Sequence, residues 1–181
     1  MLSSVRQLSP VNSYKIRQGI LQDTQAVFER IYALNEQEYD KSILVYLIRG
    51  NVSIPVAGIK YSINNTGLKI VQIAIDYRES PIIRTQIMKL LILVLIKLTV
   101  RNQTKILTYP KENVLIPLLL KNYVYESKET DNPLEMLSLS EAEAPDVDTP
   151  INFKVNAAWQ VKTKLRAEGV RYDFIDERVA A

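Results

Sequence analysis

Four stretches of the first half of the chain predict β-strands: the first and the last alternate with a period of two, 42–49 is rich in β-branched and aromatic residues, and 54–63 follows a turn. In the first stretch Tyr14 and Ile16 alternate with Lys15 and Arg17, which predicts one buried face and one solvated face. Residues typical of turns, Gly50-Asn51 and Asn64-Asn65-Thr66-Gly67, separate the later stretches. The predicted strands span residues 13–21, 42–49, 54–63 and 68–77.

Two helices are predicted among these strands from apolar residues at helical spacing. The shorter helix begins at Gln22-Asp23-Thr24 and ends near Asn35, and its apolar stripe consists of Ala26, Val27, Ile31 and Leu34. The longer helix spans about 82–102 and has an apolar face so wide that we expect it to be central in the fold. That face consists of Ile87, Leu90, Leu91, Val94, Leu95 and Leu98.

The second half of the chain predicts shorter elements. Strands are expected at 104–109 and 123–125, with a helix that opens at Pro110 between them. Thr149-Pro150 has the form of a helix start, so an amphipathic helix is predicted from there to Gly169. The residues after it alternate again over Val170, Tyr172 and Phe174, which predicts a final strand.

Composition divides the chain into four parts. Residues 126–148 hold eight acidic residues and one lysine, which is typical of a solvated linker or a flexible arm. We therefore expect an N-terminal arm at 1–12, a folded domain at 13–127, an acidic linker at 128–148, and a C-terminal amphipathic helix and tail at 149–181.

The residue types that are missing limit the possible chemistry. The chain has no Cys and no His, so thiolate and imidazole metal sites and a Ser-His pair are excluded. The most apolar run, 90–96, is shorter than the roughly 20 residues of a membrane span. With no secretory signal at the N-terminus either, we expect a cytoplasmic protein. The Lys and Arg residues of 84–121 are scattered, which predicts a solvated face and no nucleic-acid site.

The order of elements over 13–125 resembles the GNAT superfamily of acyl-CoA N-acyltransferases. The stretches YKIRQGILQDTQAVFERIY and LKIVQIAIDYRESPIIRTQIMKLL are similar to its first strand and helix and to its acetyl-CoA-binding strand, turn and helix. The resemblance implies an α/β (α+β) fold, with a mixed, mostly antiparallel sheet flanked by helices. A C-terminal tail helix would be added to that fold.

The resemblance also implies where a coenzyme would lie. Its pyrophosphate would rest on the N-terminus of the long helix, where backbone N–H groups and the helix dipole bind anions. Arg78, Arg84 and Thr85 would face the phosphates, and the backbone at Ile73 and Ile75 would take the pantetheine arm.

Two departures from the family pattern predict that this function is impaired. The glycines of the family's loop fall at Pro81, which has no N–H, and at Ile83, which is β-branched. The family's tyrosine acid, in a segment of the form Y-x-K-x-G-F, is replaced by leucine. The candidates left for proton transfer are Tyr109 as the acid and Asp76 or Glu79 as the base.

The predicted C-terminal helix suggests a role in docking. Phe153 and Trp159 are aromatic anchors on a helix that also carries Lys162 and Arg166, a composition typical of helix-in-groove recognition. Docking in cis on the parent domain and docking in trans on a partner protein both fit this pattern.

Three hypotheses follow from the sequence. The first is a degenerate GNAT-fold pseudoenzyme that binds no cofactor and acts as a protein-binding or assembly module. The second is a divergent but active N-acyltransferase that uses acetyl-CoA or another acyl-CoA. The third is an unrelated α/β adaptor that recruits a larger complex through its C-terminal helix.

Overall fold

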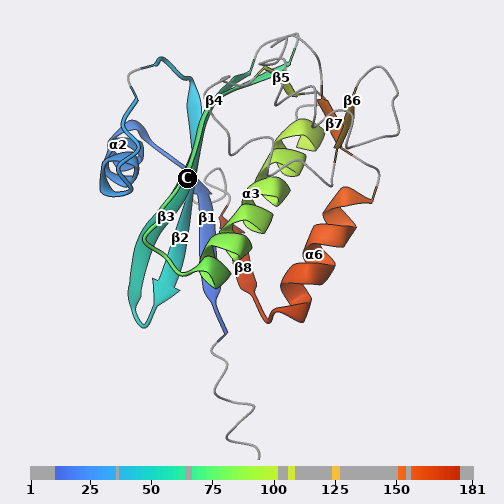
Figure 1. Cartoon of the computed structure of the whole chain (residues 1–181). Coiled ribbons are helices and arrows are strands. Elements are labelled where there is room, and N and C mark those ends of the chain that lie inside the picture. Colours follow the sequence, from blue (N-terminus) through green and yellow to red (C-terminus); the bar gives the residue numbers. More distant parts are fainter. Residues whose placement is uncertain are drawn as a thin grey trace, which may run out of the picture.

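The computed structural model describes residues 11–35, 37–63, 67–101, 106–108, 124–126, 151–153 and 156–175. Its strands form one sheet in the order β6-β7-β5-β4-β3-β2-β1-β8 (Figure 1). The pairs β1–β8 and β4–β5 are parallel and the other neighbours are antiparallel, so the predicted mixed, mostly antiparallel sheet is confirmed. The strands are β1 (Ser13–Gln18), β2 (Lys41–Arg49), β3 (Val52–Ile63), β4 (Leu68–Ile75), β5 (Ile106–Thr108), β6 (Val124–Glu126), β7 (Ile151–Phe153) and β8 (Arg171–Ile175).

Helices cover both faces of the sheet. Helix α2 (Leu21–Arg30) lies on one face, and α3 (Pro81–Arg101) and α6 (Ala157–Ala167) lie side by side on the other (Figure 1). Under α2 a small apolar cluster forms, to which Val27, Phe28 and Leu44 belong. The larger cluster lies between the sheet, α3 and α6.

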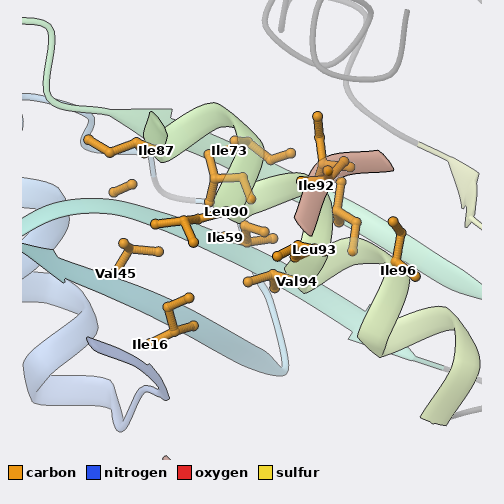
Figure 2. Close-up of a cluster of buried hydrophobic side chains, with 14 of the residues drawn as sticks. Ile16, Val45, Ile59, Ile73, Ile87, Leu90, Ile92, Leu93, Val94 and Ile96 are labelled. Atoms are coloured by element: carbon orange, nitrogen blue, oxygen red, sulfur yellow. The ribbon is translucent and has the colours of Figure 1, made fainter. Parts of the chain in front are cut away.

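Helix α3 is the central helix that its composition predicts. Apart from Lys97, its residues from Leu90 to Leu98 are buried, because the sheet covers one side of the helix and α6 covers another. Figure 2 shows Leu90, Leu93 and Val94 reaching toward side chains of the sheet such as Ile59. Helix α3 is apolar nearly all round, so exposing either side of it to water would cost free energy. Burial between the sheet and α6 avoids that cost.

The short helix differs in detail from its predicted form. It ends at Arg30 because Tyr32 adopts a left-handed backbone conformation, with a φ of 57°, which terminates the helix. Thr24 and Phe28 are buried in place of the predicted Ala26 and Leu34, which are exposed. The predicted stripe was wrong at these two positions because it selected residues by apolar character alone.

The C-terminal helix begins later than its sequence signal indicates. Residues Ile151–Phe153 form β7, which pairs with both β5 and β6, and α6 begins at Ala157. The placement of Phe153 on the amphipathic helix was therefore wrong, because strand pairing outweighs the local Thr-Pro signal. Gly169 does follow the helix end as predicted, with a φ of 74°.

The described part of 149–181 belongs to the same sheet and core as the rest. Helix α6 buries Ala157, Val161 and Leu165 against α3 and the sheet, and β8 pairs with β1. The helix thus docks in cis. Its exposed face remains open for other contacts.

The predicted acidic linker, the turn at 64–66 and the helix that opens at Pro110 lie outside the described residues.

Candidate functional site

The turn between β4 and α3 occupies the position where the resemblance places the coenzyme pyrophosphate. Ser80 caps the helix: its Oγ accepts a hydrogen bond from the Ile83 N–H at 3.3 Å, and its carbonyl accepts one from the Arg84 N–H at 2.9 Å. Pro81 occupies the first helical position and has no N–H. At the start of α3, the N–H groups of Ile83 and Arg84 are therefore occupied by Ser80, and Pro81 has none to donate.

Asp76 organises the body of this turn. Its carboxylate is buried, with 2% of the residue exposed, and it accepts hydrogen bonds from the Arg78 N–H at 3.0 Å and from Arg78 Nε and Nη2 at 2.9 Å each. Burial raises the pKa of Asp76, but the hydrogen bonds and charge of Arg78 outweigh burial and lower the pKa overall. A carboxylate held ionised in this way is a poor general base.

Arg78 ties the turn to the end of α2. Its Nη2 donates to the carbonyl of Arg30 at 2.7 Å, and its guanidinium lies 4.9 Å from the centre of the Tyr32 ring. The main chain at Tyr32 and Ala33 closes α2 with hydrogen bonds to the carbonyls of Glu29 and Phe28. The N–H, Nε and Nη2 groups of Arg78 thus all bind parts of the protein itself.

Glu79 is held by a different strand. Arg49 Nη2 at the end of β2 donates to Glu79 Oε1 at 2.6 Å, and the Glu79 side chain is only 9% exposed. The turn brings Asp76 and Glu79 close in sequence and space, since the Glu79 N–H donates to the Asp76 carbonyl at 3.3 Å. Their carboxylates, however, are directed to separate arginines and do not converge on one site.

A buried polar pair, Tyr14 and Gln86, lies behind the first turns of α3, with the half-buried Asn12 beside it. Tyr14 of β1 and Asn12 both donate to Gln86 Oε1, at 2.8 Å and 2.9 Å. Burial, with the negative charges of Glu79 and Glu168, raises the pKa of Tyr14 far above its ordinary value, so its hydroxyl stays protonated. Our sequence reasoning missed this pair, although a glutamine within the apolar run of α3 is a signal for it.

The two other predicted phosphate ligands lie in the first turn of α3. Thr85 Oγ1 donates to the Pro81 carbonyl at 2.7 Å, so its hydroxyl proton is used within the helix. The Arg84 guanidinium lies 5.8 Å from the centre of the Tyr77 ring, and its buried Nε has no hydrogen-bond partner among the described residues. Arg84 is thus a predicted phosphate ligand with a donor that has no partner among the described residues, although that Nε is buried.

The pantetheine-binding strand of the resemblance corresponds to β4. Ile73 and Ile75 are buried and pair with Ile59 and Ala57 of β3. On its other side β4 pairs with β5 only at Leu68 and Lys69 within the described residues. The described pairing of these two parallel strands therefore stops well before the turn.

The remaining predicted site residues lie elsewhere or outside the described part. Tyr109, the candidate acid, is among the residues that are not described. Trp159, Lys162 and Arg166 are all exposed on α6, with Trp159 at 68% exposure. They lie on one side of the helix because residues three, four and seven apart share a face.

The geometry defines an α+β scaffold whose candidate coenzyme turn is closed by internal hydrogen bonds. No protein-family model matches the chain, and no curated protein matches it. None of the described helices is long and apolar enough to cross a membrane. Within the described residues, Asp and Glu side chains form no group of three that could hold a metal ion.

Proposed function

We propose that this chain is a degenerate member of the GNAT superfamily that does not bind acyl-CoA and acts as a protein-binding or assembly module. The observation that carries the proposal is the state of the turn between β4 and α3. The N–H groups of Arg78, Glu79 and Ile83 donate to Asp76 or Ser80, and Pro81 has no N–H.

A diphosphate needs several free donors that point into one concave turn. To present the N–H groups of Arg78, Glu79 and Ile83, the turn would have to break three hydrogen bonds, each of which contributes about 1 kcal/mol. It would also expose the Asp76 carboxylate, whose negative charge repels phosphate. The energetic balance therefore opposes coenzyme binding.

The protein-binding part of the proposal rests on the outer face of α6. Trp159 is 68% exposed, and Lys162 and Arg166 are exposed beside it. Tryptophan and arginine are the residue types that most often dominate binding energy at protein interfaces. We infer that this face binds a protein partner or a larger complex. We further propose that the protein is cytoplasmic.

Titration calorimetry with acetyl-CoA tests the proposal. We expect no heat of binding for the wild-type chain at millimolar coenzyme, because the donors of the turn are occupied. Desulfo-coenzyme A serves as a control ligand that keeps the diphosphate but has no thiol. Micromolar affinity for either ligand would refute the proposal.

A divergent acyltransferase is the second candidate, and two observations favour it. The described pairing between β4 and β5 ends at Lys69, and Arg84 Nε has no described partner. A pantetheine arm would use an unpaired strand edge, and a phosphate would use a guanidinium donor without a partner. If acetyl-CoA does bind, Arg84→Glu should abolish that binding; unchanged affinity in that variant would exclude this second candidate.

A further inference from the structure

Strand β8 forms one edge of the sheet. It pairs with β1 on one side, and no described strand lies on its other side. The Arg171 N–H donates to the Asn12 carbonyl at 2.9 Å, which directs the backbone groups of Arg171 toward the sheet. Because successive residues of a strand direct their N–H and C=O groups to opposite edges, those of Tyr172 and Phe174 face outward.

A cation-lined cavity opens beside the start of this edge. It has a volume of about 360 Å³, and Lys162, Arg166 and Arg171 line it together with Gly169 and Tyr172. Among the described residues, no acidic side chain lines it. Within the described residues, none of the three cations forms an ion pair. Positive charge is therefore concentrated at the cavity, and none of its three cationic side chains has a described counterion.

The two described acidic residues that are adjacent in sequence to the cavity lining do not line it themselves. Glu168 forms an ion pair with Lys89 on α3, which draws its carboxylate toward that helix. Asp173 lies on β8 opposite Lys15 of β1 in the register and does not line the cavity. Burial raises the pKa of Tyr172 and the charge of Arg166 lowers it, with a net rise, so its hydroxyl is a neutral donor beside the cations.

We propose that the β8 edge and this cavity bind an extended acidic peptide segment of a partner protein. The peptide adds a strand beside Arg171–Ile175, bonds to the outward backbone groups, and places carboxylates against Lys162, Arg166 and Arg171. This inference rests on the proposed function as a protein-binding module, and it names the partner class and the mode of docking. Main-chain hydrogen bonds supply affinity, and the cations supply selectivity for acid.

Charge also argues against a second copy of the chain as the occupant. Parallel pairing of β8 with β8 of another copy would bring two such cation-lined cavities together, whereas antiparallel pairing would place the cavities at opposite ends of the paired strands and leave the charge of each unneutralised by the other. Like charges placed opposite one another in a sheet are destabilising. An acidic strand has the opposite effect, because it neutralises the cavity while it covers the open edge.

Fluorescence anisotropy with short labelled peptides tests the inference on the full chain. The probe alternates Glu and Thr, and the matched control peptide alternates Lys and Thr. We expect saturable binding of the acidic probe that weakens as salt is added, and no binding of the basic one. A third peptide, identical to the acidic probe but N-methylated at alternate residues, keeps the charge and loses the strand hydrogen bonds, so its affinity should be lower by about tenfold or more.

A variant pair tests the role of the cavity. Lys162→Glu with Arg166→Glu should reduce affinity for the acidic probe by about tenfold or more, because both changes invert charge at the cavity. Lys41→Glu with Lys69→Glu inverts the same number of exposed charges away from it and should leave affinity nearly unchanged. Circular dichroism verifies that both variants remain folded.

Several outcomes would overturn the inference. Equal binding of the N-methylated probe would mean ionic adsorption without strand addition. Equal loss in the two variants would mean a net-charge effect. A stable dimer in sedimentation, with no probe binding, would assign the edge to a second copy. If neither the acidic probe nor acetyl-CoA binds, this inference fails while the proposed function stands; if acetyl-CoA binds, the proposed function fails independently.

Discussion

Replacement of Leu165 by alanine is expected to lower the free energy of unfolding by about 2–5 kcal/mol. Leu165 is fully buried in the large apolar cluster between α6, α3 and the sheet, although it lies in the last turns of the C-terminal helix. If the helix were only tethered to the domain and not packed against it, this change would hardly alter the free energy of unfolding. Urea unfolding followed by circular dichroism measures the effect.

Thr163→Ala is the matched control on the same helix. Thr163 is exposed, so its replacement should change the free energy of unfolding by less than about 0.5 kcal/mol. Equal effects of the two substitutions would contradict the packing of α6 as described. A large effect of Leu165→Ala beside a small effect of Thr163→Ala is what the packing of α6 into the domain core requires.

Replacement of Phe28 by alanine should have an effect of similar size on the other face of the sheet. Phe28 is fully buried, and the Lys60 ammonium lies 4.4 Å from the centre of its ring. We expect the free energy of unfolding to fall by about 3–5 kcal/mol, because a large aromatic side chain leaves a cavity. Loss of packing under α2 should also loosen the Arg78 contacts at the end of that helix.

The neighbouring Gly58 allows a double-mutant cycle. A Cβ at Gly58 would lie 2.6 Å from Phe28 Cε1, so Gly58→Ala alone should destabilise the protein by about 1–3 kcal/mol through overpacking. In the Phe28→Ala background the two closest contacts disappear and the nearest remaining one is Leu44 Cδ2 at 3.3 Å, so the same change should cost much less. Additive effects would show that the two residues do not share this contact.

The strands of the first half were predictable because their local patterns and their burial agree. Tyr14 and Ile16 alternate with solvated residues and are both buried, and the long helix lies within one residue of its predicted start at 82. For β1 the period alone is sufficient, whereas much of β3 and β4 is buried on both faces because helices cover both faces of the sheet.

The C-terminal elements were harder to predict because their state depends on distant partners. Residues Ile151–Phe153 have no strand signal that outweighs Thr149-Pro150, and they become β7 through pairing with β5 and β6. The parallel pairing of β8 with β1 joins the two ends of the described chain, and no local pattern carries that information. The cis docking of α6 likewise follows from three-dimensional packing.

The candidate site was predictable in composition and unpredictable in geometry. The turn before the long helix contains no glycine and contains Pro81, which pointed to a turn with few free N–H donors. The sequence could not indicate that Arg78 turns back to Asp76 and Arg30, or that Arg49 reaches Glu79 from β2. Residues predicted as a base and a phosphate ligand instead form an ion pair that closes the turn.

Hydrogen exchange of individual backbone amides in this turn tests the central claim most directly. The N–H groups of Arg78, Glu79 and Ile83 donate to internal acceptors, whereas no acceptor is described for that of Ile82. We predict slow exchange at the first three positions and fast exchange at Ile82, with rates unchanged by acetyl-CoA or by pyrophosphate. Fast exchange at all four positions, slowed when either ligand is added, would contradict the account.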